Sequence, residues 1–426
     1  MERPGGVDWF RMKSYDDVAA KRAAILSSRL ACRRFREITY PILLPTVRVK
    51  LEQASLNRLD TISRIPDIAG GVRGIEIALA YRPKELAADL GKFITRRKVD
   101  VENARNFKLR HVYPRDPSID ASGNKSQSLG HESYCEYQRL HDEQTRLIDS
   151  GAFVDAIVSA VSRMPVFGSL LFDDTDIYAG HLTRQEREAP SMRLVLTAAD
   201  RWSTLEANPD GVPPARILSD LPIAIHRAGV TLREICITAF PRTAHAASPV
   251  IRDAISLRAA FQGLEEVNFW PRDDRSYTAA GLKYLNVYLG ALVSGHSLEH
   301  LIINATGARR GGSTEKSAIG PALKLLHGSH LKLMALQFAQ FAQSEWDAFC
   351  NRLGDQLDGL SLSDVSITDG SWRSSIRVLR QKTASRCDEG LCDVSLCSLT
   401  GGEFGRGSSE VILNWWDPQR SREFML

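Results

Sequence analysis

The sequence predicts an α/β fold, a solenoid of short parallel strands on a concave face with helices outside. Three observations predict it: a six-residue pattern recurs, its copies are regularly spaced, and apolar residues at helical spacing fill the intervals. Eight copies of the pattern apolar-x-x-apolar-x-apolar are interpreted as repeat units, and the last six begin 32, 34, 33, 26 and 34 residues apart. A repeated period of this size is typical of stacked repeat architectures. The copies begin at Val72, Phe167, Leu232, Leu264, Leu298, Leu331, Leu357 and Leu391.

Each copy is expected to form one short strand, because side chains alternate between the two faces of a strand. In the copy that begins at Leu264, Val267 and Phe269 then point inward to the helices. Glu266, Asn268 and Trp270 point outward. The outward residues of successive strands would together form one continuous surface.

The intervals contain helix signals. Pro83 suits a first helical turn, and Leu86, Leu90, Phe93 and Ile94 follow on one face. Before the copy at Leu298, apolar residues recur at spacings of three, four and three: Leu282, Leu285, Leu289 and Leu292. A further helix is expected to start at Ser344, with Asp347 three residues on.

The chain before residue 232 is less regular. The polar, breaker-rich stretch 114–133 predicts a disordered insertion. A strand of a degenerate repeat is predicted near Met192, and how many repeats lie in 98–231 stays open. The expected domains are a helical segment at 1–50 and the repeat domain at 51–426.

Composition narrows the function classes. A net charge of +4 over 426 residues argues against a dedicated nucleic-acid-binding protein. No apolar stretch is long enough for a membrane span, and the N-terminal residues do not resemble a signal peptide. The seven scattered cysteines indicate reduced thiols, so we expect a cytoplasmic or nuclear protein.

The chain lacks the common catalytic motifs, including G-x-S-x-G, H-E-x-x-H and the phosphate-binding loop that ends in G-K-[ST]. Cys387, Cys392 and Cys397 lie five residues apart, which is not zinc-finger spacing. We therefore expect no enzyme activity, no catalytic residue, no metal and no cofactor.

The segment LDGLSLSDVSIT, from Leu357 to Thr368, is close to the pattern L-x-x-L-x-L-x-x-N/C-x-L, with Val365 at the Asn/Cys position. In this respect the chain resembles leucine-rich-repeat proteins with long, irregular repeats. The resemblance implies a protein partner bound on the concave strand face. The residues expected to contact this partner are Glu234, Glu266, Asn268, Trp270, His300 and Asn304.

Residues 30–49, LACRRFREITYPILLPTVRV, are similar to the back half of an F-box and the junction that follows it in fungal-type F-box/leucine-rich-repeat proteins. The front half of an F-box has no counterpart in residues 1–29. In that family, the F-box docks a Skp-type adaptor of an SCF ubiquitin ligase. The residues matched to the adaptor side are Leu30, Cys32, Arg34, Phe35, Tyr40 and Pro41.

Two functions remain open at this point. The resemblance implies a substrate receptor of an SCF-type ubiquitin ligase. The alternative is a scaffold of leucine-rich repeats without any ligase connection. In either case the expected activity is protein recognition.

Overall fold

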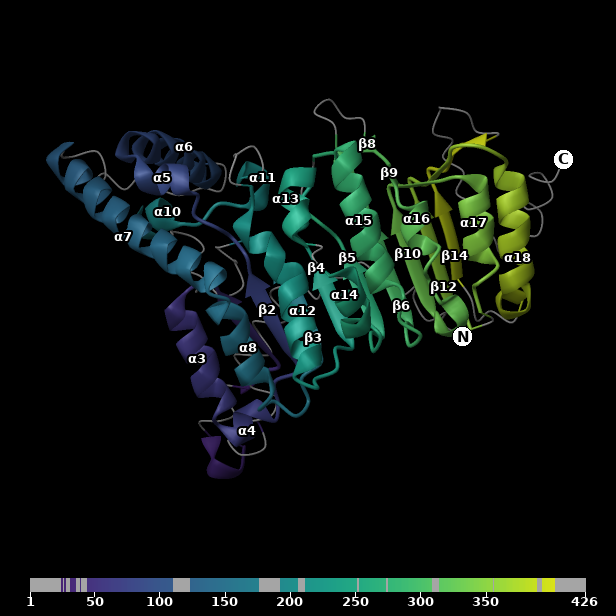
Figure 1. Ribbon diagram of the computed structural model, residues 1–426, viewed down its shortest axis with the longest axis horizontal. Coiled ribbons are helices and arrows are strands. Elements are labelled where there is room, and N and C mark those ends of the chain that lie inside the picture. Colours follow the sequence, from purple (N-terminus) through teal and green to yellow (C-terminus); the bar gives the residue numbers. More distant parts are fainter. Residues whose placement is uncertain are drawn as a thin grey trace.

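The computed structural model describes residues 24–25, 27, 31–35, 39, 44–109, 123–175, 192–205, 211–250, 253–272, 275–308, 314–354, 356–388 and 393–402. Its main feature is an open, nine-stranded parallel sheet whose strands lie side by side in the order in which they occur along the chain (Figure 1). The strands are β1 (Thr46–Lys50), β2 (Gly74–Ala78), β3 (Ser169–Asp173), β4 (Glu234–Ile237), β5 (Glu266–Phe269), β6 (His300–Asn304), β10 (Leu333–Gln337), β12 (Gly359–Ser363) and β14 (Asp393–Cys397). The predicted α/β class with parallel strands is confirmed.

The eight sequence copies pair with one another in a single register. The third residue of each copy is aligned with the third residue of the next, from Gly74 through Glu234 and His300 to Asp393. The inward residues are almost fully buried; Val267 and Phe269, for example, are both 0% exposed. The strand positions and their inward faces therefore agree with the prediction.

A ninth strand extends the sheet at its N-terminal edge. β1 pairs in parallel with β2, and its Val47 and Val49 are buried like the inward residues of the other strands. The sheet therefore begins at Thr46, before the domain boundary that was predicted at residue 50. Leu44, Val47 and Val49 have the spacing of the hexamer.

Helices pack on one face of the sheet, in front of it in Figure 1. Each contacts the next along the row. The row consists of α3 (Gln53–Ser63), α8 (Ala152–Val161), α12 (Ile217–Arg227), α14 (Ala254–Ala260), α15 (Ala279–Leu292), α16 (Gly320–Leu323), α17 (Gln343–Cys350) and α18 (Trp372–Asp388). Shorter helices near the row are α4 (Pro66–Ala69), α11 (Trp202–Leu205) and α13 (Ala244–Ala247).

A separate group of helices lies at the upper left of Figure 1: α5 (Lys84–Ala88), α6 (Leu90–Leu109), α7 (Gly123–Asp149) and α10 (Met192–Thr197). Its own small core contains Phe93, Tyr134 and Tyr137. Buried Arg97 pairs with Asp100 of the same helix at 2.7 Å and holds α6 against the segment after α10 by an ion pair to Asp200 at 3.3 Å. In the sequence, α5, α6 and α7 lie between the hexamers that begin at Val72 and Phe167, and α10 lies between those that begin at Phe167 and Leu232.

Three local predictions need correction. The segment at Met192 is helix α10 and not a strand, and it lies against helices α6 and α7 instead of in the sheet. The second half of the stretch predicted as disordered, from Gly123, is the start of α7, and residues 110–122 lie outside the described residues. α17 begins at Gln343 rather than Ser344, because the Glu345 carboxylate accepts a hydrogen bond from the Ala342 amide at 3.0 Å.

A second, four-stranded parallel sheet lies beyond the carboxyl ends of the last main strands. It contains β9 (Ser317–Ala318), β11 (Ala339–Phe341), β13 (Ser366–Ile367) and β15 (Thr400–Gly401). A short hairpin of β7 (Gly307–Ala308) and β8 (Thr314–Glu315) precedes it.

The same turn connects the two sheets three times. The residue after β10, β12 and β14 is Phe338, Asp364 and Ser398, with φ angles of 55°, 55° and 52°. The left-handed conformation is unfavourable for residues with a Cβ, and Phe338 has neither the small size nor the short polar side chain that eases it. The left-handed conformation recurs at the same position in three successive turns, which indicates that the change of direction between the two sheets requires this conformation.

Backbone groups at these turns bond to each other. Phe338 N–H donates to the Ser363 carbonyl at 3.1 Å, and Asp364 N–H donates to the Cys397 carbonyl at 3.0 Å. Val365 stands where the leucine-rich-repeat pattern has Asn or Cys and is fully buried. The backbone N–H groups at these turns are therefore satisfied by carbonyls of the neighbouring segment. No Asn side chain is needed for this, so the apolar Val365 is tolerated at the Asn/Cys position.

The strand register predicts opposite effects for two adjacent substitutions. Leu360→Asp places a carboxylate among inward residues and should lower the free energy of unfolding by about 4 kcal/mol. Ser361→Asp replaces a half-exposed outward residue and should change the free energy of unfolding by less than about 0.5 kcal/mol. Denaturant melts of both variants measure this, and equal effects would contradict the register.

The left-handed turn predicts the effect of substitutions at Asp364. Asp364→Val should cost about 1–2 kcal/mol, because a β-branched side chain fits this conformation poorly. Asp364→Asn, the matched control, should be close to neutral because Asn tolerates it. Denaturant melts compare the two, and a Val variant as stable as the Asn variant would argue against a strained turn.

Candidate functional site

The candidate site is the outward surface of β4, β5 and β6, which we call the open strand face. It consists of Glu234, Cys236, Glu266, Asn268, His300 and Ile302. Glu234 is exposed and the other five residues are partly exposed. Farther along the sheet the outward residues Arg48 and Glu76, toward β1, and Leu333 and Ala335, on β10, are buried, whereas Ser169 and Leu171 of the adjacent β3 are partly exposed.

The first row of the open strand face contains three titratable residues. Glu234 is aligned with Glu266, and Glu266 with His300. The His300 Nδ1 lies 3.8 Å from the Glu266 carboxylate, and both side chains are 42% exposed. Burial and the neighbouring Glu234 raise the pKa of Glu266 above its ordinary value, while His300 acts in the opposite direction.

The second row is uncharged. Burial and then Glu234 raise the pKa of the Cys236 thiol to about 12, so the thiol stays protonated at neutral pH. A protonated thiol is a poor nucleophile. Asn268 is aligned with Cys236 and Ile302, and its Oδ1 is shielded from solvent without a hydrogen-bond partner in the described part of the chain.

Two predicted contact residues lie elsewhere. Asn304 is buried, and its amide is used within the chain: Nδ2 donates to Gln337 at 3.1 Å and Oδ1 accepts from the Thr306 amide at 2.9 Å. Trp270 follows the end of β5 and is partly exposed. Continued past the end of β5, the register places Trp270 level with Asn304 and about four residues, roughly 13 Å, farther along the strands than His300.

The residues matched to an F-box are described only in part. Cys32, Arg34 and Phe35 are exposed, Phe35 to 52%. Leu30, Tyr40 and Pro41 lie outside the described residues, as do the side chain of Cys387 and all of Cys392. The hydroxyl of buried Thr39 donates a hydrogen bond to the Phe35 carbonyl at 2.6 Å.

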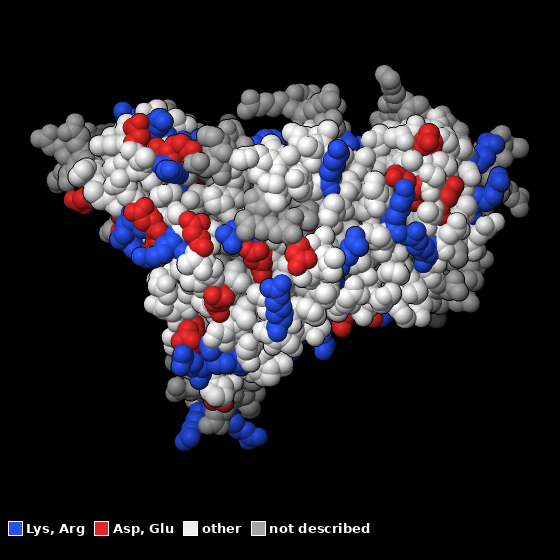
Figure 2. Space-filling view, viewed as in Figure 1, with Lys and Arg blue, Asp and Glu red and all other residues white. Residues whose placement is uncertain are grey.

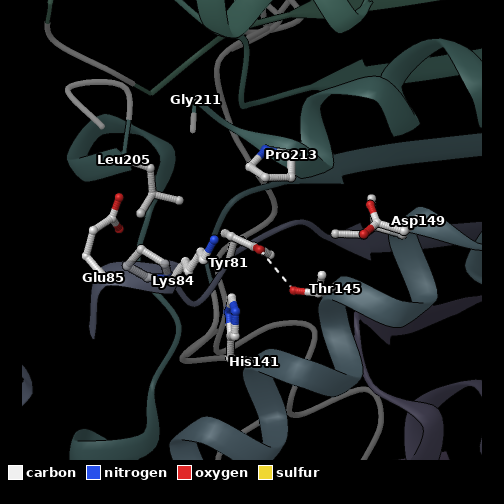
Figure 3. Close-up of a pocket in the computed structure, with 11 residues that line it drawn as sticks. Tyr81, Lys84, Glu85, His141, Thr145, Asp149, Leu205, Gly211 and Pro213 are labelled. Carbon is white, nitrogen blue, oxygen red and sulfur yellow. Dashed lines mark hydrogen bonds between the residues drawn. The ribbon is translucent and has the colours of Figure 1, made fainter. Parts of the chain in front are cut away.

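A pocket of about 190 Å³ lies where α5, α7 and α11 approach the end of β2 (Figure 3). Buried His141 and Tyr81 line it, and Lys84 and Asp149 are exposed at its rim. His141 Nδ1 lies 2.7 Å from the Arg82 carbonyl, and because a carbonyl only accepts, Nδ1 is the donor. The Tyr81 and Thr145 hydroxyls are 3.2 Å apart. These hydrogen bonds join α7 to the segment after β2. The polar side chains that line the pocket therefore have a structural role in holding α7 in place.

The described residues form neither a surface patch of one charge on the helix side nor a metal-binding cluster that would compete with the open strand face as a candidate site. On the helix side shown in Figure 2, basic and acidic side chains are interspersed. Among the described residues, no three His, Cys, Asp or Glu side chains lie close enough to hold a metal ion. None of the described helices has the length and apolar character needed to cross a bilayer.

Comparisons of the chain with family models, with curated proteins and with solved structures found no match.

The raised pKa of Glu266 predicts a pH-dependent gain in stability on Glu234→Gln. A carboxyl group with a raised folded-state pKa contributes stability below its ordinary pKa of 4.5, and this contribution is lost as the pH rises through the folded-state value. Removing the Glu234 charge should therefore stabilise the protein at pH 7, by roughly 0.3–0.5 kcal/mol, and much less below pH 4.5.

Denaturant melts at pH 4 and pH 7 test this prediction. Glu265→Gln is the matched control, because Glu265 lies at the rim next to Arg233 at 3.9 Å and should gain nothing at pH 7. A Glu234→Gln variant that is less stable than the parent at pH 7 would show that the two glutamates do not repel each other.

Proposed function

We propose that this protein is a recognition module that binds a partner protein on the open strand face, in a fold built from stacked repeats of the leucine-rich type. One observation carries the proposal. Three adjacent strands present partly exposed polar side chains, Glu234 to His300 in one row, on a rigid parallel sheet whose inward side is fully packed.

Rigid elements suit recognition because their side chains lose little further freedom on binding. The face also offers mixed chemistry, with carboxylates, an imidazole, an amide and the apolar Ile302. Polar and apolar groups side by side are typical of protein-binding surfaces. The repeat interpretation is supported by the chain order of the strands and by the common register of the hexamers.

A second candidate function adds a docking site for a Skp-type adaptor and hence a role in an SCF-type ubiquitin ligase. The exposed Phe35, beside Arg34, favours it, because an aromatic side chain on a basic surface is a suitable anchor for a protein interface. This candidate rests on the resemblance of residues 30–49, and co-purification of the full chain with the adaptor, lost in Phe35→Ala, is its test.

Site-specific photo-crosslinking tests the recognition function. A photoreactive amino acid placed at Ile302, on the open strand face, should crosslink to a discrete partner in an extract of the source cells. The same residue placed at Ile255, which is 83% exposed on helix α14, is the matched control. The crosslink from position 302 should also disappear in Asn268→Arg, which obstructs the face.

Equal crosslinking from positions 302 and 255, or crosslinking from 255 alone, would contradict the proposal. So would a crosslink from 302 that persists unchanged in Asn268→Arg. Thermal melts of each variant confirm that the fold is retained.

A further inference from the structure

We propose that the first row of the open strand face, Glu234, Glu266 and His300, receives an arginine side chain from an extended segment of the partner. This inference rests on the proposed function and names the chemistry of the partner at that surface.

The geometry of the row places two carboxylates at the distance that one guanidinium can span. Glu234 and Glu266 are direct neighbours on adjacent parallel strands, which lie about 4.8 Å apart. Both side chains project outward, since Ile235 and Val267, next to them in sequence, are buried on the helix side. A guanidinium has five donors in a planar fork and can bond two carboxylates at once.

The charges around the row are unevenly compensated. The rim carboxylates have basic partners: Glu265 lies 3.9 Å from Arg233, and Glu299 lies 2.7 Å from Lys332 Nζ. Within the described residues, Glu234 has no ion pair. Glu266 pairs, among these residues, only with His300, at 3.8 Å. Like charges directly opposite on neighbouring strands destabilise a sheet.

The repulsion is therefore concentrated in the middle of an accessible surface, where a cation from outside would relieve it. The raised pKa of Glu266 agrees with this, because burial and Glu234 disfavour its charged form. A bound cation would reverse that effect and restore the carboxylate.

The second row completes the complementarity. Cys236 and Ile302 offer an apolar floor for the methylene stem of an arginine. The Asn268 Oδ1, between them, is a hydrogen-bond acceptor without a partner in the described residues. It is a fully shielded atom, so a small rotation of the amide is needed for it to accept a hydrogen bond from the guanidinium.

Model peptides test the inference. The probes are fluorescently labelled peptides of about ten residues in which serine alternates with arginine, with lysine or with glutamate, and the measurement is fluorescence anisotropy at low salt. We expect binding of the arginine peptide, weaker binding of the lysine peptide and none of the glutamate peptide. The net charge of +4 would by itself give the opposite order.

Two double variants with the same change in charge separate the row from general electrostatics. Glu234→Gln/Glu266→Gln should weaken arginine-peptide binding by about tenfold or more, since two charge-assisted contacts are lost. Glu265→Gln/Glu299→Gln, which removes two compensated carboxylates at the rim, should leave it within about twofold. Equal losses in the two variants, no arginine-peptide binding, or binding of the glutamate peptide would overturn the inference.

The outcome is distinguishable from failure of the proposed function. If position 302 crosslinks to a partner and arginine-peptide binding does not depend on Glu234 and Glu266, the face is a binding surface with another chemistry. If position 302 gives no specific crosslink, the proposed function fails, whatever the peptides do.

Discussion

The fold depends on burial of the inward side chains of each strand against the row of helices. A single strand and one helix cannot enclose those side chains, so each strand depends on packing against the strands and helices beside it. The common register follows from this constraint, because a shift of one residue would move Leu360 to the outward face and Ser361 inward. Burial on the helix side leaves the other face of the sheet free to vary in chemistry.

The chemistry of the outward residues differs along the sheet. Toward β1 the outward residues form a buried ion pair, with Arg48 Nη1 2.9 Å from Glu76 Oε1. Toward β10 they are buried and apolar, as at Leu333 and Ala335. Among the described strand residues, exposed carboxylates on adjacent strands occur only at β4 and β5. Repulsion between Glu234 and Glu266 lowers the stability of the fold. Residues that lower stability and have no structural role are typical of binding sites.

Sequence reasoning succeeded where the signal was local and periodic. The hexamers located eight strands and their inward faces, because a buried strand next to a helix layer must alternate. It failed where the decisive contact is long-range. Phe338 adopts a left-handed turn that its residue type does not indicate, and the segment at Met192 is helical because it packs against α6 and α7. Of the predicted contact residues, Glu234, Glu266, Asn268 and His300 lie together, whereas Asn304 is buried through a partner, Gln337, from the next strand.

The small area of the open strand face has a consequence for the kind of complex that forms there. Three strands about 4.8 Å apart, each about four residues long, cover on the order of 200 Å². A stable complex between folded domains buries about 800 Å² on each partner. A contact area this small suits a short linear segment held by a few side chains. Complexes of that kind dissociate rapidly, so their lifetime depends on individual contacts and on whatever the partner binds beyond this surface.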